Sequence, residues 1–252
     1  MIVPNAPIQR DHLERIEDPS ASGLWSPLRR WYLPCKNVIE ILVAISLLVL
    51  ASPIIVLAAL FVKLTSSGPA FYSQTRCGKS GRPFSIHKLR TMYHNCESAT
   101  GPRWSTPGDA RITLLGRILR RTHIDELPQL WNVVRGDMSL IGPRPERPEF
   151  IPGLAEKLPH YTERLLVKPG MTGLAQVQLP PDTDLESVRR KLAYDLYYVR
   201  YVSPWLDLRI LAGTCFYLLR MPLELLPRLR LVPQRRVIEE NYRRASGNIA
   251  VA

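Results

Sequence analysis

Residues 41–62, ILVAISLLVLASPIIVLAALFV, form the longest uncharged run of the chain. At about 1.5 Å of rise per residue, a helix of this length can cross a bilayer core of about 30 Å. Ser52-Pro53 lies at the centre of the run, where proline removes a helical hydrogen bond. The hydroxyl of Ser52 can satisfy a carbonyl freed there. The pattern thus fits either a kinked spanning helix or a re-entrant helix-break-helix hairpin.

The charges around this run bear on the choice between the two. Basic residues stand on both sides of it: Arg29, Arg30 and Lys36 before it, and Lys63, Arg76, Lys79 and Arg82 after it. The positive-inside rule therefore gives no clear orientation for a crossing, and both flanks suit the cytoplasmic side. A re-entrant hairpin satisfies both observations, while a proline-kinked span also stays open on the residues alone.

The rest of the pattern predicts an α+β fold that is mostly helical. Residues 68–92 contain two β-like runs around a Gly-Lys-Ser-Gly turn, which predicts a small β-hairpin. Helical spacing of apolar residues occurs at 111–121, 123–134 and 185–202.

A second segment with membrane character lies near the C-terminus. Residues 203–232 mix Trp, Tyr, Leu and Arg with several prolines, and no uncharged stretch there is long enough to span. We expect short amphipathic helices on the membrane surface. Amphipathic helices on a soluble core would give the same pattern.

Composition narrows the class of partner. The chain has 252 residues and a formal net charge of +12, which favours nucleic acid, acidic lipids or phosphorylated substrates. Its four cysteines are scattered, without a CxxC pair or histidines at metal-ligand spacing, and we interpret them as free thiols. Residues 1–27 lack the apolar core of a signal peptide and are expected to form a loosely ordered tail.

The candidate chemistry begins at two adjacent acids, Asp125 and Glu126, in RRTHIDELPQLWNVVRG. Thr122-x-x-Asp125 fits a capping box, which is a purely structural explanation. The surrounding arginines allow another one, because an ionised aspartate beside cations can attack phosphorus. Acids beside phosphates can also hold Mg²⁺. Nucleic-acid binding gives these acids no role, so we expect no nucleic-acid partner.

Candidate phosphate ligands stand on either side of the acidic pair. Arg144 lies between Pro143 and Pro145, and a stiff loop can hold its planar fork on a phosphate. A solvated loop arginine is the structural alternative. Lys88 and Arg90 alternate along a β-like run and can share one face, although an exposed polar strand face would look the same.

These residues lie in an ordered set of motifs from about residue 36 to 212 that resembles the bacterial sugar transferases, the monotopic phosphoglycosyl transferases. The motifs are the apolar run with Ser52-Pro53, KLTSSGPAFYSQTRCGKSGRPFSIHKLRTM (63–92), RRTHIDELPQLWNVVRGDMSLIGPRPERPEF (120–150), KPGMTGLAQV (168–177) and WLDLRIL (205–211). One such motif is weak evidence, whereas five in order are specific.

The resemblance implies a role for each candidate. Asp125 and Glu126 match the catalytic and Mg²⁺-binding dyad, and Ser52-Pro53 matches the break of a re-entrant hairpin. The implied phosphate ligands are Lys88, Arg90, Pro143 and Arg144. Lys36 and Glu40 match the basic residue and acid that begin the membrane helix, and Glu40 stands where the family commonly has Asp.

The resemblance also implies an activity and a location. Such an enzyme transfers a sugar 1-phosphate from a nucleotide-diphosphate sugar, here expected to be UDP-linked, to polyprenyl (undecaprenyl) phosphate and releases UMP. The reaction passes through a covalent aspartyl phosphosugar and is the first membrane step of exopolysaccharide, capsule, O-antigen or glycoconjugate synthesis. The expected location is the cytoplasmic face of the inner membrane. A non-catalytic, membrane-anchored protein that binds anionic lipid or a partner is the alternative from another class.

The expected organisation has four parts: a tail and membrane-proximal segment at 1–35, the re-entrant hairpin at 36–64, a cytoplasmic catalytic domain at 65–212 and an amphipathic segment with a tail at 213–252. The sequence leaves open which sugar is transferred, which pathway is served and what the oligomeric state is, a homodimer included.

Overall fold

The structure, a computed structural model, describes residues 27–98, 101, 108–180, 182, 184–219, 221 and 232–245. Its elements in chain order are α2 (Pro27–Thr65), β1 (Phe71–Cys77), η1 (Lys79–Gly81), β2 (Pro83–Leu89), α3 (Leu114–Thr122), η2 (Ile124–Glu126), α4 (Gln129–Val134), β3 (Ser139–Ile141), α5 (Ile151–Lys157), η3 (Tyr161–Leu166), β4 (Gly170–Thr172), α6 (Leu185–Tyr201), α7 (Pro204–Leu218) and α9 (Arg235–Ala245). Residues 1–26 of the predicted N-terminal tail, residues 222–231 and the last residues, 246–252, lie outside the described part.

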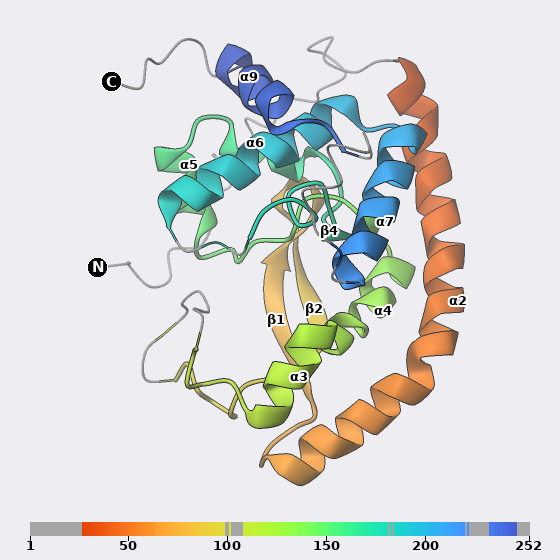
Figure 1. Cartoon of the computed structure of the whole chain (residues 1–252), viewed down its shortest axis with the longest axis vertical. Helices are drawn as coiled ribbons and strands as arrows, with labels where there is room; N and C mark the ends of the chain where they lie inside the picture. The colour runs from red at the N-terminus through yellow and green to blue at the C-terminus, as the bar shows by residue number, and fades with distance from the viewer. Residues whose placement is uncertain are drawn as a thin grey trace.

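The apolar run forms the middle and end of one long helix, α2, which lies along one side of the molecule and bends along its length (Figure 1). Pro53 stands inside the helix, and Ser52 Oγ donates a hydrogen bond to the carbonyl of Val49 at 2.8 Å. Residues Trp31–Thr65 are long and apolar enough to cross a membrane, judged by length and composition. The long apolar helix is confirmed, but the structure does not show a hairpin.

The predicted β-hairpin is present. Strands β1 and β2 pair antiparallel, with Phe71 opposite Leu89 and Cys77 opposite Pro83. Ser80 and Gly81 both have positive φ angles in the turn, where glycine carries no steric penalty. A second, smaller sheet pairs β3 with β4 in parallel. The α+β, mostly helical class is therefore confirmed.

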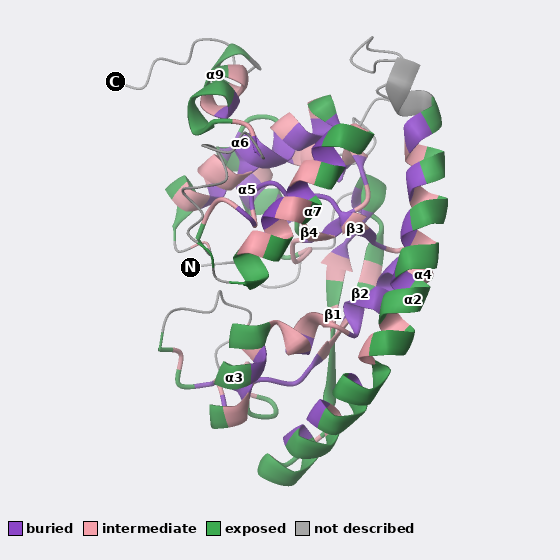
Figure 2. Ribbon diagram, turned by 45° about the vertical axis from the view of Figure 1, so that its right-hand side comes forward, coloured by how far each residue is buried: buried purple, intermediate pink, exposed green. Residues whose placement is uncertain are grey.

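The core of the globular part lies between α6 and the elements around it. Figure 2 shows buried positions along the inner face of α6, and Val188, Leu192 and Val199 are among them, as the helical spacing predicted. Asp184 begins this helix with a capping box, because its side chain accepts from the amide of Ser187 while Ser187 Oγ accepts in return.

The segment around the acidic pair forms three short elements, α3, η2 and α4, where the spacing predicted helices at 111–121 and 123–134. Helix α3 begins where the side chain of Thr113 accepts a hydrogen bond from Gly116, and it ends at His123, whose φ is 57°. The η2 turn then carries the two acids, and α4 follows Pro128. Thr122 Oγ1 donates back to helical carbonyls, and η2 has no side-chain cap. The capping-box explanation is therefore wrong.

A buried polar network fastens α2 to the globular part. Lys36 Nζ lies 3.0 Å from Glu40 Oε1 and also contacts the carboxylate of Asp207 on α7. Tyr198 on α6 donates to Asp207 at 2.9 Å, and Ser139 on β3 donates to Glu40. These residues are buried, so each charge relies on its partners rather than on water. The start of the long helix is thereby fixed against three other elements.

Candidate active site

The two acids stand on η2, between α3 and α4, and the fold turns them inward. His123 adopts the left-handed conformation that ends α3, and its carbonyl accepts the amide of Glu126 at 3.1 Å. Only 6% of Asp125 is exposed. The local chain reversal thus places two adjacent carboxylates at the inner end of a short turn, rather than on the outer face of a helix.

Glu126 is held by two cations from distant parts of the chain. Lys88 Nζ on β2 donates to Glu126 Oε1 at 2.7 Å. The guanidinium of Arg144 grips the same carboxylate with two nitrogens, one of them on Oε2 at 3.3 Å. Lys88, Arg144 and the acidic pair, which the sequence predicted as one site, therefore meet in space.

The charges set the protonation of this group. Burial alone would raise the pKa of the Glu126 carboxyl, but the charges of Arg144 and Lys88 outweigh it and hold that pKa well below its usual range. Burial lowers the pKa of Lys88 in spite of Glu126, whereas the charge of Glu126 raises the pKa of Arg144. Glu126 is thus ionised and neutralised by its two partners.

Asp125 stands in a different environment. Burial, followed by the charge of Glu126, raises the pKa of its carboxyl, while Lys88, Arg120 and His123 oppose that rise. Asp125 Oδ1 is buried and has no hydrogen-bond partner among the described residues. A buried carboxylate oxygen without a partner is costly, so it is a candidate for contact with a substrate or a cation.

The loop that carries Arg144 is positioned by close backbone contacts. The carbonyl of Pro143 accepts the amide of Gly170 at 2.9 Å. A Cβ on Gly142 would lie 2.5 Å from the carbonyl oxygen of Lys168, so this approach requires glycine. The proline-flanked loop predicted from sequence is therefore fixed where β3 meets β4.

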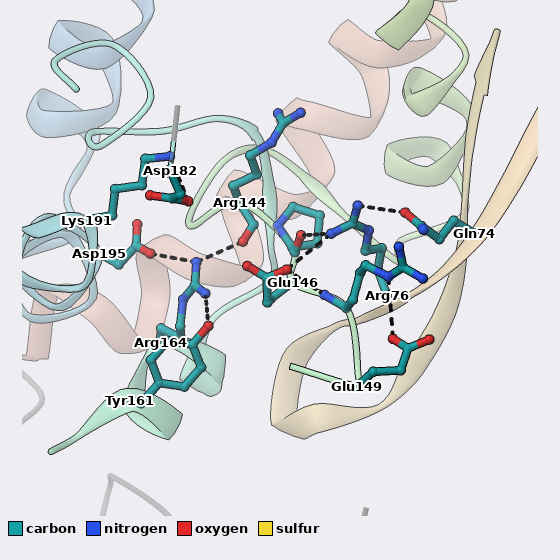
Figure 3. Close-up of polar contacts among 12 residues, drawn as sticks. Gln74, Arg76, Arg144, Glu146, Glu149, Tyr161, Arg164, Asp182, Lys191 and Asp195 are labelled. Atoms are coloured by element: carbon teal, nitrogen blue, oxygen red, sulfur yellow. Dashed lines mark hydrogen bonds and ion pairs between the residues drawn. The ribbon is translucent and has the colours of Figure 1, made fainter. Parts of the chain in front are cut away.

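Arg164 supports the same loop from behind. Its guanidinium donates to the Arg144 carbonyl at 2.9 Å and to the Tyr161 hydroxyl at 2.8 Å, and it forms a 2.7 Å ion pair with buried Asp195 (Figure 3). Arg76 holds the far side, donating to the carbonyl of Pro145 at 3.2 Å. Sequence reasoning missed Arg164 and Asp195, because partners so far apart in the chain leave no periodic signal.

Arg90 is not part of this group. Its guanidinium donates to the carbonyls of Ser66 and Ser67 and to Ser66 Oγ, the first and last at 2.8 and 2.9 Å. These contacts fasten the end of β2 to the chain that leaves α2. The other predicted feature of α2, Ser52-Pro53, lies in the interior of that helix.

A cavity of about 1100 Å³ adjoins the site. Glu126 and Arg144 line it together with Asp182 and Lys191, which form a 3.0 Å ion pair. Apolar side chains of α2 and α7 also line it, as do the charged side chains of Lys36, Glu40 and Asp207 on the same two helices. The cavity thus combines charged and apolar lining residues.

The residues at the dyad fit a Mg²⁺ ion in part. The unpartnered oxygen of Asp125 is a hard anionic donor of the kind that Mg²⁺ prefers. Glu126 would have to share its carboxylate with Lys88 and Arg144. No cluster of three or more His, Cys, Asp or Glu side chains suited to a metal occurs in the described ranges. Further ligands would come from water and substrate phosphate, as is usual for this ion.

Comparison with known proteins places these motifs in a family. The profile described as "Bacterial sugar transferase" matches residues 31–221. The UDP-N-acetylgalactosamine-undecaprenyl-phosphate N-acetylgalactosaminephosphotransferase of Aeromonas hydrophila is 40% identical over 207 residues, which cover 82% of this chain and 48% of that protein. The UDP-glucose:undecaprenyl-phosphate glucose-1-phosphate transferase of Caulobacter vibrioides is 46% identical over 181 residues, 71% of this chain and 67% of the relative.

A third relative is matched over nearly its whole length. The exopolysaccharide production protein PSS of Rhizobium leguminosarum bv. phaseoli is 40% identical over 187 residues, 72% of this chain and 94% of its own. Against the Aeromonas protein, by contrast, the match spans about half the relative's length. The matched region holds the acidic dyad, its two cations and the long apolar helix. The chain therefore belongs to the bacterial sugar transferase family.

Proposed function

We propose that this chain transfers a sugar 1-phosphate from a UDP-linked sugar to undecaprenyl phosphate and releases UMP. The names of the relatives support this reaction, since they pair a UDP-sugar with that lipid phosphate. The observation that carries the proposal is the unpartnered, buried oxygen of Asp125 beside a carboxylate held by two cations. The product would begin the assembly of an exopolysaccharide or a related glycoconjugate.

The first step is attack by Asp125 on the β-phosphorus of the nucleotide sugar. A bond forms between the carboxylate oxygen and phosphorus, and the bond from phosphorus to the bridging oxygen breaks. UMP leaves with that electron pair, and the phosphosugar stays on the aspartate. Oδ1 of Asp125 is suited to be the nucleophile because it accepts no hydrogen bond within the described residues.

The second step returns the aspartate to its starting form. A phosphate oxygen of undecaprenyl phosphate attacks the same phosphorus, and the bond to Asp125 breaks. The product is undecaprenyl-diphosphate sugar. Because Asp125 is nucleophile in one step and leaving group in the next, its environment must favour neither state strongly. Burial and the Glu126 charge on one side, and the surrounding cations on the other, provide such a balance.

Lys88 and Arg144 stabilise the charge that develops on the phosphoryl oxygens. Both cations already converge on Glu126, so they are in place before substrate arrives. A Mg²⁺ ion, when bound by Asp125 and Glu126, supplies further neutralisation of phosphate charge. Glu126 has two candidate roles, as ligand to that ion and as proton handler. Arg90 would contribute only indirectly, because its guanidinium holds the backbone at Ser66 and Ser67 and does not reach Glu126's partners.

We also propose that α2 enters and leaves the cytoplasmic leaflet without crossing. The bend, the Ser52 hydrogen bond beside Pro53 and the basic flanks support this monotopic arrangement. It would hold the dyad at the level of the lipid headgroups, where the acceptor phosphate lies.

The test is release of UMP from a panel of UDP-sugars, with purified protein, Mg²⁺ and undecaprenyl phosphate. UDP-N-acetylgalactosamine, UDP-glucose and UDP-galactose belong in the panel. We expect one donor to give UMP release that depends on the acceptor. If no nucleotide sugar yields UMP while the protein still binds lipid, the non-catalytic alternative holds.

A further inference from the structure

Two apolar stripes face the cavity and are left uncovered. On α2 the exposed apolar residues that line the cavity follow helical spacing: Ile39, Val43, Leu47, Leu50 and Ile54. On α7 the exposed apolar lining residues are Leu208, Leu211, Tyr217 and Leu218. All of them are more than a third exposed, and Leu50 is 74% exposed. Apolar stripes on neighbouring helices usually pack on each other, so a gap between them has room for an apolar ligand.

The cavity extends from this gap to Glu126. His123, directly before η2, and Tyr217, near the end of α7, both line the cavity, and their ring centroids are 5.2 Å apart. Glu126 and Arg144 line the same cavity. One cavity therefore has apolar residues on two helices and charged residues at Glu126 and Arg144, and the His123–Tyr217 pair lines it as well.

From this arrangement we propose that the space between α2 and α7 holds the isoprenoid chain of the acceptor and that His123 positions the acceptor's phosphate. The proposal rests on the proposed function and assigns the acceptor its place within that site. The imidazole of His123 can donate a hydrogen bond to a phosphate oxygen, and Arg144 supplies positive charge nearby. The chain would then run from Tyr217 toward Leu208, about 13 Å along the helix at 1.5 Å per residue.

The chain groove is tested by filling its far end. Leu208→Trp is expected to raise the KM for undecaprenyl phosphate about tenfold, a loss typical of a displaced apolar contact. The KM for geranyl phosphate, whose two isoprene units end short of Leu208, should stay near the wild-type value. Val49→Trp and Leu219→Trp are matched controls, since both residues are exposed and neither lines the cavity. If Leu208→Trp behaves as these controls do, the groove is not the chain site.

His123 is tested by separating donor from acceptor. His123→Gly removes the ring without straining the positive φ, and His123→Asn keeps a hydrogen-bond donor in a residue that tolerates that φ. We expect His123→Gly to raise the KM of both acceptors about tenfold, and His123→Asn to restore most of the loss. Exchange of labelled UMP into the UDP-sugar, which needs no acceptor, should fall far less than the acceptor kcat/KM does. His160→Gly is the control, because His160 has φ 63° and does not line the cavity.

Two outcomes overturn the role of His123: an unchanged acceptor KM in His123→Gly, or an equal loss of UMP exchange. Failure of the proposed function has a different signature, namely no UMP release by wild-type protein from any donor. In that case direct binding of labelled undecaprenyl phosphate still tests the groove. Wild-type binding that Leu208→Trp weakens, and that Val49→Trp does not, would support it; equal binding by all three would refute it.

Discussion

Asp125 and Glu126 are neighbours on one short turn, and the structure displaces the pKa values of their carboxyl groups in opposite directions. Burial and the charge of Glu126 raise the pKa of Asp125. Glu126 experiences burial too, but Arg144 and Lys88 hold its pKa well below the usual range. Two adjacent acids whose pKa values are pushed apart are suited to different roles in one reaction. The predictions that follow begin from this difference.

The first prediction concerns the pH dependence of UMP exchange. Asp125 must be ionised to attack phosphorus, and its raised pKa moves its loss of charge above the usual value of about 3.9. We expect kcat/KM for the donor to fall on the acid side with a midpoint above that value. Glu126→Gln removes the neighbouring negative charge and should shift the midpoint to lower pH, whatever it does to the rate. If the midpoint does not move in Glu126→Gln, the loss of activity at low pH is not caused by protonation of Asp125.

The second prediction is that Asp125→Asn abolishes turnover and stabilises the fold. The amide cannot attack phosphorus, so we expect a loss of at least about a thousandfold. The pKa of the Asp125 carboxyl is higher in the folded protein than in the unfolded protein. Between these two pKa values the folded state binds more protons, so the stability of the fold decreases as the pH rises through that range. At neutral pH the ionised carboxylate of Asp125 thus destabilises the fold, and Asp125→Asn removes this destabilisation. Thermal unfolding should show a higher Tm for Asp125→Asn at pH 7 and little difference below about pH 3.9.

Much of the fold and site follows from local sequence. The long apolar helix, the β-hairpin around its Gly-Lys-Ser-Gly turn and the helix at 185–202 were predictable, because periodicity and turn residues act over short distances. The family assignment, which rested on the ordered motifs, is confirmed. The contact of Lys88 and Arg144 with Glu126 could be predicted from the family resemblance, but not from any local pattern.

Other contacts depend on tertiary packing and gave no signal. Asp207 reads as an ordinary polar residue in the first turn of an amphipathic helix, yet it is buried against Lys36 from a distant part of the chain. Alternation along β2 predicted that Lys88 and Arg90 share a face, but the strand ends at Leu89. Arg90 consequently contacts Ser66 and the chain beside it. The period of two applies only within a strand.

The third prediction is that Arg144→Lys impairs catalysis although the charge is kept. Arg144 grips both oxygens of Glu126, so it is not the free solvated residue of the structural alternative. Lysine loses the planar fork, and the loop fixed at Gly142 and Gly170 cannot move to compensate. A charge-assisted hydrogen bond is worth about 2 kcal/mol, which is roughly thirtyfold in rate. A donor kcat/KM within about twofold of wild type would remove Arg144 from the phosphate site.

The fourth prediction concerns the network that fixes α2. Lys36→Met leaves Glu40 and Asp207 as adjacent buried acids without their shared cation, and we expect a loss of about 3 kcal/mol in the free energy of unfolding. Combining it with Asp207→Asn should restore part of that loss, because one uncompensated charge is removed. Arg189→Met is the control: its ion pair with Glu186 is exposed, and its removal should cost less than about 1 kcal/mol. Denaturant unfolding in detergent measures all three, and equal losses for Lys36→Met and Arg189→Met would contradict the role of the network.

The fifth prediction is that both ends of α2 face the cytoplasm. The bend near the middle of the helix and the basic flanks support a re-entrant path, whereas a crossing would put the N-terminal tail in the periplasm. The background for labelling replaces the exposed Cys35 and Cys215 and the half-buried Cys96 by serine. Cys77 can stay, because it is buried and burial raises the pKa of its thiol to about 11, so little reactive thiolate forms.

One cysteine is then added to this background at Ser22, before α2, and in a separate variant at Ser67, after it. An impermeant maleimide added to intact cells should label neither, and both should react once the cells are opened. Labelling of the Ser22→Cys variant alone in intact cells would show that α2 crosses the membrane. It would leave the chemistry at Asp125 untouched, since the dyad follows α2 in the chain and would stay on the side where Ser67 lies.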